Sequence, residues 1–531
     1  MKFILKIFSI FLFSFISILH AADEELIVTG SYFEDKSLDS SPVDLISFQE
    51  MENFNLSSLS EIGKFIHTSS GSHFQSDSME GTDQGMANIN LRGLNLSATL
   101  VMINSKRNTL AGLPAESGDS YVDINLIPQV VVERIEILKE GATSLYGSDA
   151  IAGVVNFLTF KDFEGSKLKI SNQKTQHYGQ DERRLDFLHG NKINNFNLIF
   201  GFEVLNRSSL PSKKIDGISE LGISIFGNTY IAKEDGTFAA SGVYSGTTYE
   251  EGAKIKDPNC IANGGTFYAG YCGFLYGDRF NVINDENHQK FYFNVNKSFD
   301  AYSISSTFIS SSISVNDNPQ SPSYPALSFP EIGVGKAGSP FNKAVTWYGR
   351  PLGASSPSPF SPKEIDQFHF SSSLNLNLSD SKKLEFSLTH SEHENTMSRP
   401  DTISSRFSAA LNNTGGPNSD LTWNLFDSSQ NTEALKSYIS GSEDSTHRSK
   451  LSIIDVLFKN KINNVDYILG IQAGSESLDV NWNDLSRVEF DADGKMSKAA
   501  DLLFLGGGSN VDSQREKLSL IHISEPTRLH G

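Results

Sequence analysis

The side chains best suited to metal or redox chemistry in this chain are two histidines and two cysteines. His390 and His393 enclose a serine and a glutamate, a spacing that could hold a metal ion. The run stands where an alternating strand enters a long polar segment, so we favour a solvated loop. Cys260 and Cys272 lie twelve residues apart. We expect a loop disulfide; a metal pair is the minor alternative, because no His or acidic cluster flanks them at ligand spacing.

No residue pattern that carries catalysis is present. The chain lacks a Gly-x-Ser-x-Gly elbow, a phosphate-binding P-loop and a His-Glu-x-x-His motif. The run from Asp491 to Gly494 shares the start of a calcium loop but lacks the remaining ligands and the closing Glu, so it predicts a plain turn. We therefore expect no enzyme activity, no cofactor and no metal site.

The most informative run extends from Glu133 to Asn156 and reads Glu-Arg-Ile-Glu-Ile-Leu-Lys-Glu-Gly-Ala-Thr-Ser-Leu-Tyr-Gly-Ser-Asp-Ala-Ile-Ala-Gly-Val-Val-Asn. It joins a strand, a glycine turn, a short helix and a second glycine turn. The run resembles the end of the plug domain of TonB-dependent outer-membrane receptors almost residue for residue. This resemblance implies a plug domain inside a transmembrane barrel, with energy supplied from the inner membrane.

The elements expected of such a plug begin at Pro42, and we place the domain at residues 42–160. Ser58 to Glu61 forms a capping box ahead of apolar residues at helical spacing. Asn104-Ser105 predicts a two-residue turn where the family more often has Asp-Gly, a change that Asn tolerates because it accepts positive φ. The predicted strands are Val43–Ile46, Leu100–Ile103, Lys106–Arg107 and Val130–Leu138.

The resemblance also implies roles for individual plug residues. Arg92 matches the Arg of the family's Leu-Arg-Gly turn, and Arg134 matches the Arg of its Val-Glu-Arg-Ile strand. In the family these arginines resemble a lock, in which they pair with glutamates of the inner barrel wall; guanidinium suits this because it stays charged and bonds bidentately. Pairing within the plug is the alternative. The residues expected to form plug turns are Gly93, Gly141, Gly147 and Gly153.

The first 22 residues predict a signal peptide. Lys2 and Lys6 precede the uncharged apolar run Ile7–Leu19, and two alanines follow as a cleavage site. The apolar run is shorter than the ~20 residues of a membrane-spanning helix. We therefore expect an exported chain.

Residues 23–41 are expected to hold a TonB box and a linker. Leu26, Ile27, Val28 and Thr29 form a short β-prone run after acidic residues. Ahead of a plug, this run resembles the TonB box, which pairs with the energising protein TonB by strand addition.

From Gly165 the chain alternates apolar and polar residues. Phe368 and Phe370 share one strand face, while Gln367 and His369 share the other. Apolar-out, polar-in alternation is typical of membrane barrels, although one such strand would also fit a secreted sandwich. Short links alternate with long polar segments near 208–287, 316–365 and 392–447, which favours a barrel with long external loops. The predicted fold class is mainly β: a transmembrane antiparallel barrel with a small α+β N-terminal plug.

The barrel is expected to be incomplete. We assign residues 161–518 to it and find about nine candidate strands, whereas large plugged transporters close with about 22. Ser519–Gly531 resembles translated sequencing-adapter readthrough more than protein, so we expect a C-terminally truncated chain with an artefactual tail. A polar loop cut at an arbitrary point is the alternative for these last residues.

The formal charge of −19 argues against a nucleic-acid partner, because phosphate binding requires a cationic surface. The resemblance implies a receptor of the cell outer membrane, surrounded by its lipid. It would take up a scarce or bulky ligand using TonB and the inner-membrane energising complex. Siderophore-iron, cobalamin, haem and oligosaccharide all remain open as ligands.

Three other functions are alternatives. A signalling receptor with an extra N-terminal domain is disfavoured, because few residues separate the leader from the box. A non-functional fragment would follow if the barrel cannot close. An exported β-solenoid or sandwich enzyme is remote given the plug motifs. The loop aromatics that would suit a sugar or aryl ligand, or pack on one another, are Tyr268, Tyr271, Phe274 and Tyr276.

Overall fold

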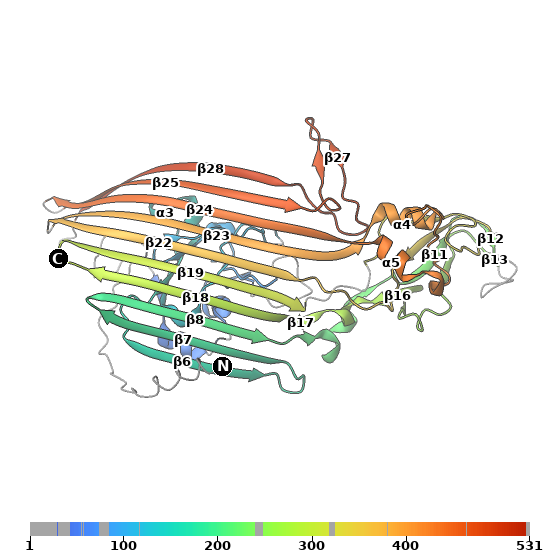
Figure 1. Cartoon of the computed structure of the whole chain (residues 1–531), viewed down its shortest axis with the longest axis horizontal. Helices are drawn as coiled ribbons and strands as arrows, with labels where there is room; N and C mark the ends of the chain where they lie inside the picture. Colours follow the sequence, from blue (N-terminus) through green and yellow to red (C-terminus); the bar gives the residue numbers. More distant parts are fainter. Residues whose placement is uncertain are drawn as a thin grey trace.

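The computed structural model describes Thr29, Leu56 and residues 43–54, 58–73, 84–115, 117–238, 248–317, 324–379, 381–462 and 465–526. The predicted signal peptide, Leu26 to Val28 of the predicted TonB box and the last five residues lie outside the described residues. A wide curved sheet of long strands surrounds a small sheet, and a folded module stands at one end of the wide sheet (Figure 1).

The small sheet forms the core of the plug. Its strands lie in the order β1 (Val43–Ser47), β4 (Val132–Leu138), β5 (Gly153–Thr159), β2 (Thr99–Ile103) and β3 (Lys106–Arg107). β2 runs parallel to β5, and the other neighbours are antiparallel. The short helices of the plug are α2 (Phe48–Phe54), η1 (Leu59–Phe65), η2 (Leu96–Ala98), η3 (Gln129–Val131), α3 (Thr143–Tyr146) and η4 (Ser148–Ala150).

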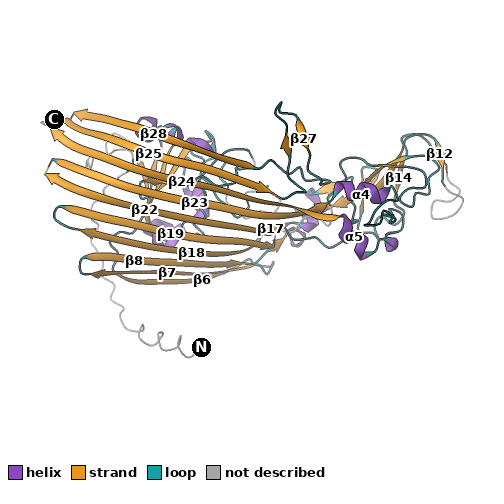
Figure 2. Ribbon diagram, turned by 45° about the horizontal axis from the view of Figure 1, so that its top comes forward, coloured by secondary structure: helices purple, strands orange, loops and turns teal. Residues whose placement is uncertain are grey.

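The wide sheet is an antiparallel meander of ten strands, each hydrogen-bonded to the next along the chain. Figure 2 shows them side by side. They are β6 (Gly165–Lys174), β7 (Asp181–Ile193), β8 (Phe196–Arg207), β18 (Asp285–Ser298), β19 (Tyr302–Asp317), β22 (Lys363–Ser379), β23 (Lys382–Thr402), β24 (Ser440–Ile462), β25 (Val465–Trp482) and β28 (Val511–Pro526). The last strand therefore includes part of the segment expected to be a tail.

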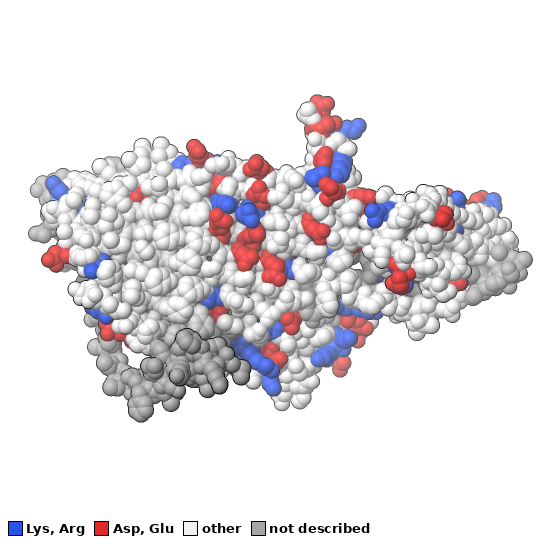
Figure 3. All heavy atoms as spheres, viewed as in Figure 1, with Lys and Arg blue, Asp and Glu red and all other residues white. Residues whose placement is uncertain are grey.

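The outward face of this sheet is apolar near the short turns. An aromatic ladder crosses four strands there: the ring centroids of Phe200 and Phe291 are 5.0 Å apart, and those of Phe308 and Phe368 are 5.3 Å apart. Figure 3 shows that this part of the outer surface is largely uncharged, while charged side chains gather nearer the folded module. No helix among the described residues is long and apolar enough to cross a membrane.

The polar segment predicted near 392–447 is too long at both ends. β23 continues to Thr402 and β24 begins at Ser440, so the link covers only residues 403–439. Above the apolar band the outward positions carry charges, and Glu394 pairs there with Arg448. Alternation of apolar and polar residues is lost in that part, although the strand continues.

Long segments at one end of the sheet fold together into a loop module, which we define as the described residues of 208–284, 324–362 and 403–439. Its main sheet has the order β14 (Lys254–Lys256), β11 (Asn228–Ala232), β21 (Val345–Gly349) and β20 (Glu331–Ile332). Its helices include α4 (Ser404–Leu411) and α5 (Glu433–Ile439). The smaller strands are β9 (Leu210–Pro211), β10 (Ile223–Ser224), β12 (Gly236–Thr237), β13 (Thr248–Tyr249), β15 (Thr266–Tyr268), β16 (Tyr271–Leu275) and β17 (Asn281–Ile283); one-turn helices are η5 (Ser212–Lys214), η6 (Ser219–Leu221), η7 (Tyr276–Arg279) and η8 (Ser428–Gln430).

All three segments contribute to one apolar core of the module. Tyr230 comes from the first segment, Trp347 from the second, and Phe407 and Trp423 from the third. A separate hairpin of β26 (Glu489–Phe490) and β27 (Met496–Lys498) turns at Gly494, as the sequence predicts for the run that begins at Asp491 (Figure 1).

The turn glycines of the plug differ in why glycine is needed. Gly93, Gly147 and Gly153 have φ of +64°, +86° and +142°, which L side chains rarely adopt. Gly141 has no positive φ, but a Cβ there would lie 3.1 Å from the carbonyl oxygen of Ile151. Gly153 combines both constraints, since a Cβ would lie 2.3 Å from the carbonyl oxygen of Leu138 in the neighbouring strand β4.

We predict that Gly153→Ala lowers the free energy of unfolding by about 3 kcal/mol, because it adds both backbone strain and a clash with β4. Gly118→Ala is the matched control: its φ is +86° and no atom lies within 4 Å of the added Cβ. Thermal unfolding of the purified protein measures both. Equal destabilisation by the two substitutions would contradict the role given to the close approach.

Candidate functional site: the plug, its wall and the loop module

Arg92 is bound within the plug. It adopts a φ of +57°, and its guanidinium donates to the carbonyl oxygens of Ile151 and Ala152 at 3.0 and 3.1 Å. These carbonyls belong to the turn that precedes β5. Arg92 therefore holds two plug segments together, as under the alternative of pairing within the plug, and its lock with a wall glutamate stays a prediction.

Arg134 also takes partners from its own strand. Its Nε lies 3.0 Å from Glu136 and its terminal nitrogen 3.4 Å from Glu133. Residues 134 and 136 share a face of β4, and the Glu136 side chain is fully buried, so it needs a cation nearby. Both arginines thus make the contacts expected under the alternative of pairing within the plug.

The wall carries its own buried ion cluster, which sequence reasoning missed. Glu203 on β8 lies 3.1 Å from Arg184 on β7 and 3.0 Å from Lys290 on β18, and all three side chains are at most 2% exposed. Arg184 also lies 2.7 Å from Asp186. The signal was present in the sequence, as ionisable residues at alternate, inward-facing strand positions.

This cluster binds the plug through the plug's backbone. The amide N–H of Gln129, the first residue of η3, donates to Glu203 at 2.9 Å, and Arg184 donates to the side chain of Gln129 at 2.8 Å. A wall carboxylate therefore accepts a bond from an otherwise unpaired N–H at the start of a helical turn. The arrangement differs from the predicted lock, because here the wall supplies both the arginine and the glutamate.

Apolar side chains join plug and wall on the same side. Leu188, Ile199, Tyr292 and Ile309 of β7, β8, β18 and β19 belong to the same buried cluster as the plug core. Tyr292 also donates to Thr159 at the end of β5, at 2.7 Å.

A further contact lies at β6. Lys167 and Lys169 lie 2.9 and 3.3 Å from Glu52 of α2. Burial raises the pKa of Glu52, but the two lysines outweigh that effect and hold the pKa below its ordinary value.

His393 is buried between plug and wall. The solvated loop predicted for the run from His390 to His393 is therefore wrong, because this run lies in a strand. His393 lies inside β23, its Nδ1 accepts the N–H of Gly112 at 3.2 Å, and its Nε2 lies 3.5 Å from Asp123. His390 points to the opposite face and contacts Glu392 at 3.2 Å. The described residues hold no group of three or more His, Cys, Asp or Glu that could bind a metal ion.

A cavity of about 920 Å³ lies between the plug and the wall and is lined by both polar and apolar side chains. The plug lines it with α3 and with residues Asn104–Arg107, which we call the bridging turn. On β19 and β22 the wall lines it with the hydroxyl and amide side chains of Ser303, Ser305, Thr307, Ser371, Ser373 and Asn375. On β23–β25 it adds charged and apolar side chains, among them Glu385, Leu451 and Glu476.

Two side chains of the bridging turn reach the wall. Lys106 lies 3.0 Å from Glu385 and donates to Ser387 at 2.9 Å, both on β23. Asn104 donates to Thr307 on β19 at 3.2 Å. Asn104 and Ser105 have φ of +51° and +62°, as a tight two-residue hairpin turn requires.

Thr29, the last residue of the predicted TonB box, is bound to the plug sheet and is only 1% exposed. Its N–H donates to Glu136 at 2.8 Å, and its hydroxyl accepts from Asn156 of β5 at 3.0 Å. Glu136 and Asn156 are therefore site residues that the sequence did not single out.

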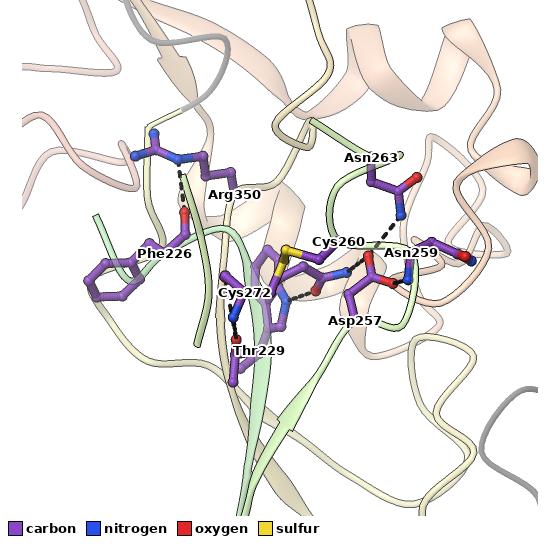
Figure 4. The surroundings of a disulfide bond; sticks show 10 residues. Phe226, Thr229, Asp257, Asn259, Cys260, Asn263, Cys272 and Arg350 are labelled. Carbon is purple, nitrogen blue, oxygen red and sulfur yellow. Dashed lines mark hydrogen bonds between the residues drawn. A yellow bond between two sulfur atoms is a disulfide. The ribbon is translucent and has the colours of Figure 1, made fainter. Parts of the chain in front are cut away.

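Cys260 and Cys272 form a disulfide within the loop module (Figure 4). The hydroxyl of Thr229 accepts the N–H of Cys272 at 2.8 Å, which attaches the bridge to β11. On the other side, Asp257 accepts from the backbone N–H of Asn259 and the side chain of Asn263, both at 2.8 Å. The disulfide thus joins a self-bonded loop to the main sheet of the module.

The aromatic residues of this loop have different environments. Phe274 is buried, and Arg350 lies 4.3 Å from its ring centroid while donating to the carbonyl of Phe226 (Figure 4). Burial lowers the pKa of Arg350 to about 10, so it stays charged at neutral pH. Tyr271 packs against Lys254, whereas Tyr268 is 43% exposed. Tyr276 packs against Phe280.

This plug-in-barrel geometry is matched by known proteins. Residues 36–154 match the family model described as the TonB-dependent receptor plug domain. The chain is also similar to a solved variant of the ferric enterobactin receptor of Pseudomonas aeruginosa, with 13% identity, a TM-score of 0.53, and coverage of 92% of this chain and 56% of that one. A second variant of that receptor, in complex with enterobactin, gives 12% identity, a TM-score of 0.52, and coverage of 93% and 57%.

Identity this low shows the fold alone, and the chain spans little more than half the length of these structures. The fold defines the class: a plug domain enclosed by strands of an antiparallel barrel. The chain therefore carries a TonB-dependent receptor plug domain at residues 36–154, followed by strands that have the fold of part of a barrel.

We predict that Glu203→Gln lowers the free energy of unfolding by about 3–5 kcal/mol, because Arg184 and Lys290 would lose a buried counter-charge. Glu433→Gln is the control, since Glu433 pairs with Lys436 but is 87% exposed, and it should leave the melting temperature unchanged. Thermal unfolding in detergent measures both. A melting temperature for Glu203→Gln equal to that of the unsubstituted protein would argue against the cluster's role.

We predict that Cys260→Ser destabilises the loop module by about 2–3 kcal/mol, because the bridge no longer restricts the unfolded loop. Limited proteolysis of the substituted protein should cut the module faster, while cleavage of the plug is unchanged. Faster cleavage of the plug as well would show that the disulfide acts beyond the module.

Proposed function

We propose that this protein is an outer-membrane receptor that takes up a scarce or bulky ligand actively, with energy delivered by TonB. The observation that carries the proposal is the placement of Thr29. The end of the predicted TonB box is bound directly to two buried side chains of the plug sheet, Glu136 and Asn156. A pull on the N-terminal segment would therefore act on the centre of the plug.

The membrane location is supported by the outer surface of the wide sheet. Phe291 and Phe293 are 38% and 39% exposed, and Leu388 and Ile454 are 44% and 56% exposed. So large an apolar surface suits lipid, in which a barrel satisfies its backbone between strands. The loop module then lies outside the cell, and the short turns face the periplasm.

The need for TonB follows from the compartment. The outer membrane has no ATP, so work must arrive through a periplasmic contact. Strand addition to residues 26–29 would supply that contact mainly through backbone hydrogen bonds.

For the ligand, we place siderophore-iron first. The support is that the two similar solved structures described above are variants of one ferric enterobactin receptor, and one of them is in complex with enterobactin. Cobalamin, haem and oligosaccharide remain the other classes. The catalytic patterns missing from the sequence give no support to an enzyme.

We predict that deleting residues 24–30 abolishes uptake of ferric enterobactin but leaves its binding intact. The experiment uses the full-length protein in cells that lack other receptors for this probe, with iron-55 in the siderophore. Binding is measured with the proton gradient collapsed, and uptake with the gradient present.

Deletion of residues 32–38 in the predicted linker is the matched control and should preserve uptake. Uptake that persists without residues 24–30 would show that the TonB box lies elsewhere. A protein that neither binds nor accumulates ferric enterobactin would remove this siderophore from the ligand classes.

A further inference from the structure

We propose that three histidines of the wall attach the plug only while their rings are uncharged, so that acid detaches this part of the plug. The three are His369 on β22, His393 on β23 and His447 on β24. They contact plug residues 108–112, which we call the docking segment. Such an attachment responds to pH without a ligand or TonB, so it is independent of the uptake function proposed above.

The three rings lie at neighbouring inward positions of the wall. His393 is opposite Gln367, which is two residues from His369. His447 is opposite Asn395, which is two residues from His393. Residues two apart in a strand share a face, so all three side chains point toward the plug. His369, His393 and His447 are only 1%, 0% and 5% exposed.

The first half of the docking segment is held by His369 and by serines of the wall. Nδ1 of His369 donates to the side-chain oxygen of Asn108 at 3.2 Å. Thr109 donates its N–H to Ser391 at 2.9 Å, and its hydroxyl lies 3.1 Å from that of Ser449. Among the described residues, Nε2 of His369 has no hydrogen-bond partner. A proton added there would therefore be buried without an acceptor.

The second half of the docking segment depends on His393 as an acceptor. Gly112 donates its N–H to Nδ1 of His393 at 3.2 Å. A ring nitrogen that accepts carries no hydrogen, so a second proton on this ring would break the bond. Gly112 also lies against the next strand, because a Cβ there would be 2.5 Å from the backbone carbonyl oxygen of His447.

One acidic side chain of the plug faces His393. Oδ2 of Asp123 lies 3.5 Å from its Nε2, while Oδ1 accepts the N–H groups of Ala87 and Asn125 at 2.8 and 2.9 Å. The charge of Asp123 would favour an added proton on His393. It would not restore the bond from Gly112, so the docking segment still loses its acceptor.

The charges around the other two rings oppose an added proton. Lys363 and Arg399 act on His447, and both are cations that repel a further positive charge. His390, on the opposite face of β23, is the ionisable group that acts on His369, and it would itself be positive in acid. Protonation of either ring within the attached plug is therefore unfavourable.

The direction of the pH effect follows from proton binding. When the docking segment detaches, an exposed ring has the ordinary histidine pKa of about 6.5. Below that pH the detached form binds protons that the attached form does not, so acid favours detachment. For one histidine, a change from about pH 7.5 to about pH 5 shifts this equilibrium about 30-fold. The attachment is fully present above about pH 6.5 and is lost as the pH falls further.

Hydrogen exchange of backbone amides tests this attachment in the purified full-length protein. Mass spectrometry follows peptides that contain Thr109 and Gly112 at about pH 7.5 and about pH 5, with the intrinsic effect of pH on exchange corrected. We expect exchange at least about tenfold faster at the lower pH. The amide of Gln129 is the internal control, because it is held by Glu203 instead of a histidine, and its corrected rate should not change. Equal corrected rates for the docking segment at both pH values would overturn the inference.

Asparagine substitutions distinguish the histidines from a general effect of acid. The amide oxygen of Asn can accept in place of Nδ1 and takes up no proton in this pH range. We expect His393→Asn to reduce the pH effect at least about threefold, and the combination of His369→Asn, His393→Asn and His447→Asn to remove it. His390→Asn is the matched control and should retain the effect. A pH effect that persists in the combined variant, or is lost in His390→Asn, would contradict the role of the three rings.

Discussion

The shared apolar core between the plug and β7, β8, β18 and β19 is the constraint on which the other features depend. It fixes one side of the plug, as Leu188 and Ile199 pack into the plug's own core. Apolar contacts have no preferred direction but require close packing. They therefore hold the plug at one position against the wall.

The ion cluster around Glu203 fixes the orientation of the plug against the wall. A buried carboxylate with Arg184 and Lys290 beside it stays ordered, and it presents an acceptor to the N–H of Gln129. Such a cluster contributes little net stability compared with an apolar core. Its hydrogen bonds form in only one orientation of the plug, so it favours that orientation. Apolar contact and ionic contact thus fix position and orientation separately.

Local patterns in the sequence predicted much of the fold. The hairpin around Asn104-Ser105 and the outward faces of the long strands follow from turn chemistry and alternation. The strand predicted at Val130–Leu138 also forms, but it begins at Val132 because Val130 and Val131 belong to η3. The contacts that Arg92 and Arg134 make within the plug did not follow from the resemblance, which points to wall glutamates as their partners. The buried position of His393 was also missed, since its strand is polar on both faces where its outward positions carry charges such as Glu394.

The contacts that make the site are non-local, which is why sequence reasoning could not assemble them. Thr29 and Glu136 are 107 residues apart, and Lys106 and Glu385 are 279 apart. Periodicity reports which face of a strand a residue occupies, but not which distant element covers that face. Ionisable residues at inward strand positions are the one signal that could have indicated Arg184, Glu203 and Lys290.

The single core of the loop module has a consequence for how its loops could evolve and move. Tyr230, Trp347 and Phe407 come from three different links between strands, yet each packs against side chains from the others. A change in the length or composition of one link must therefore be accommodated by the other two. The three links form one cooperative unit that tilts or unfolds as a whole, in contrast to independent flaps that close one at a time.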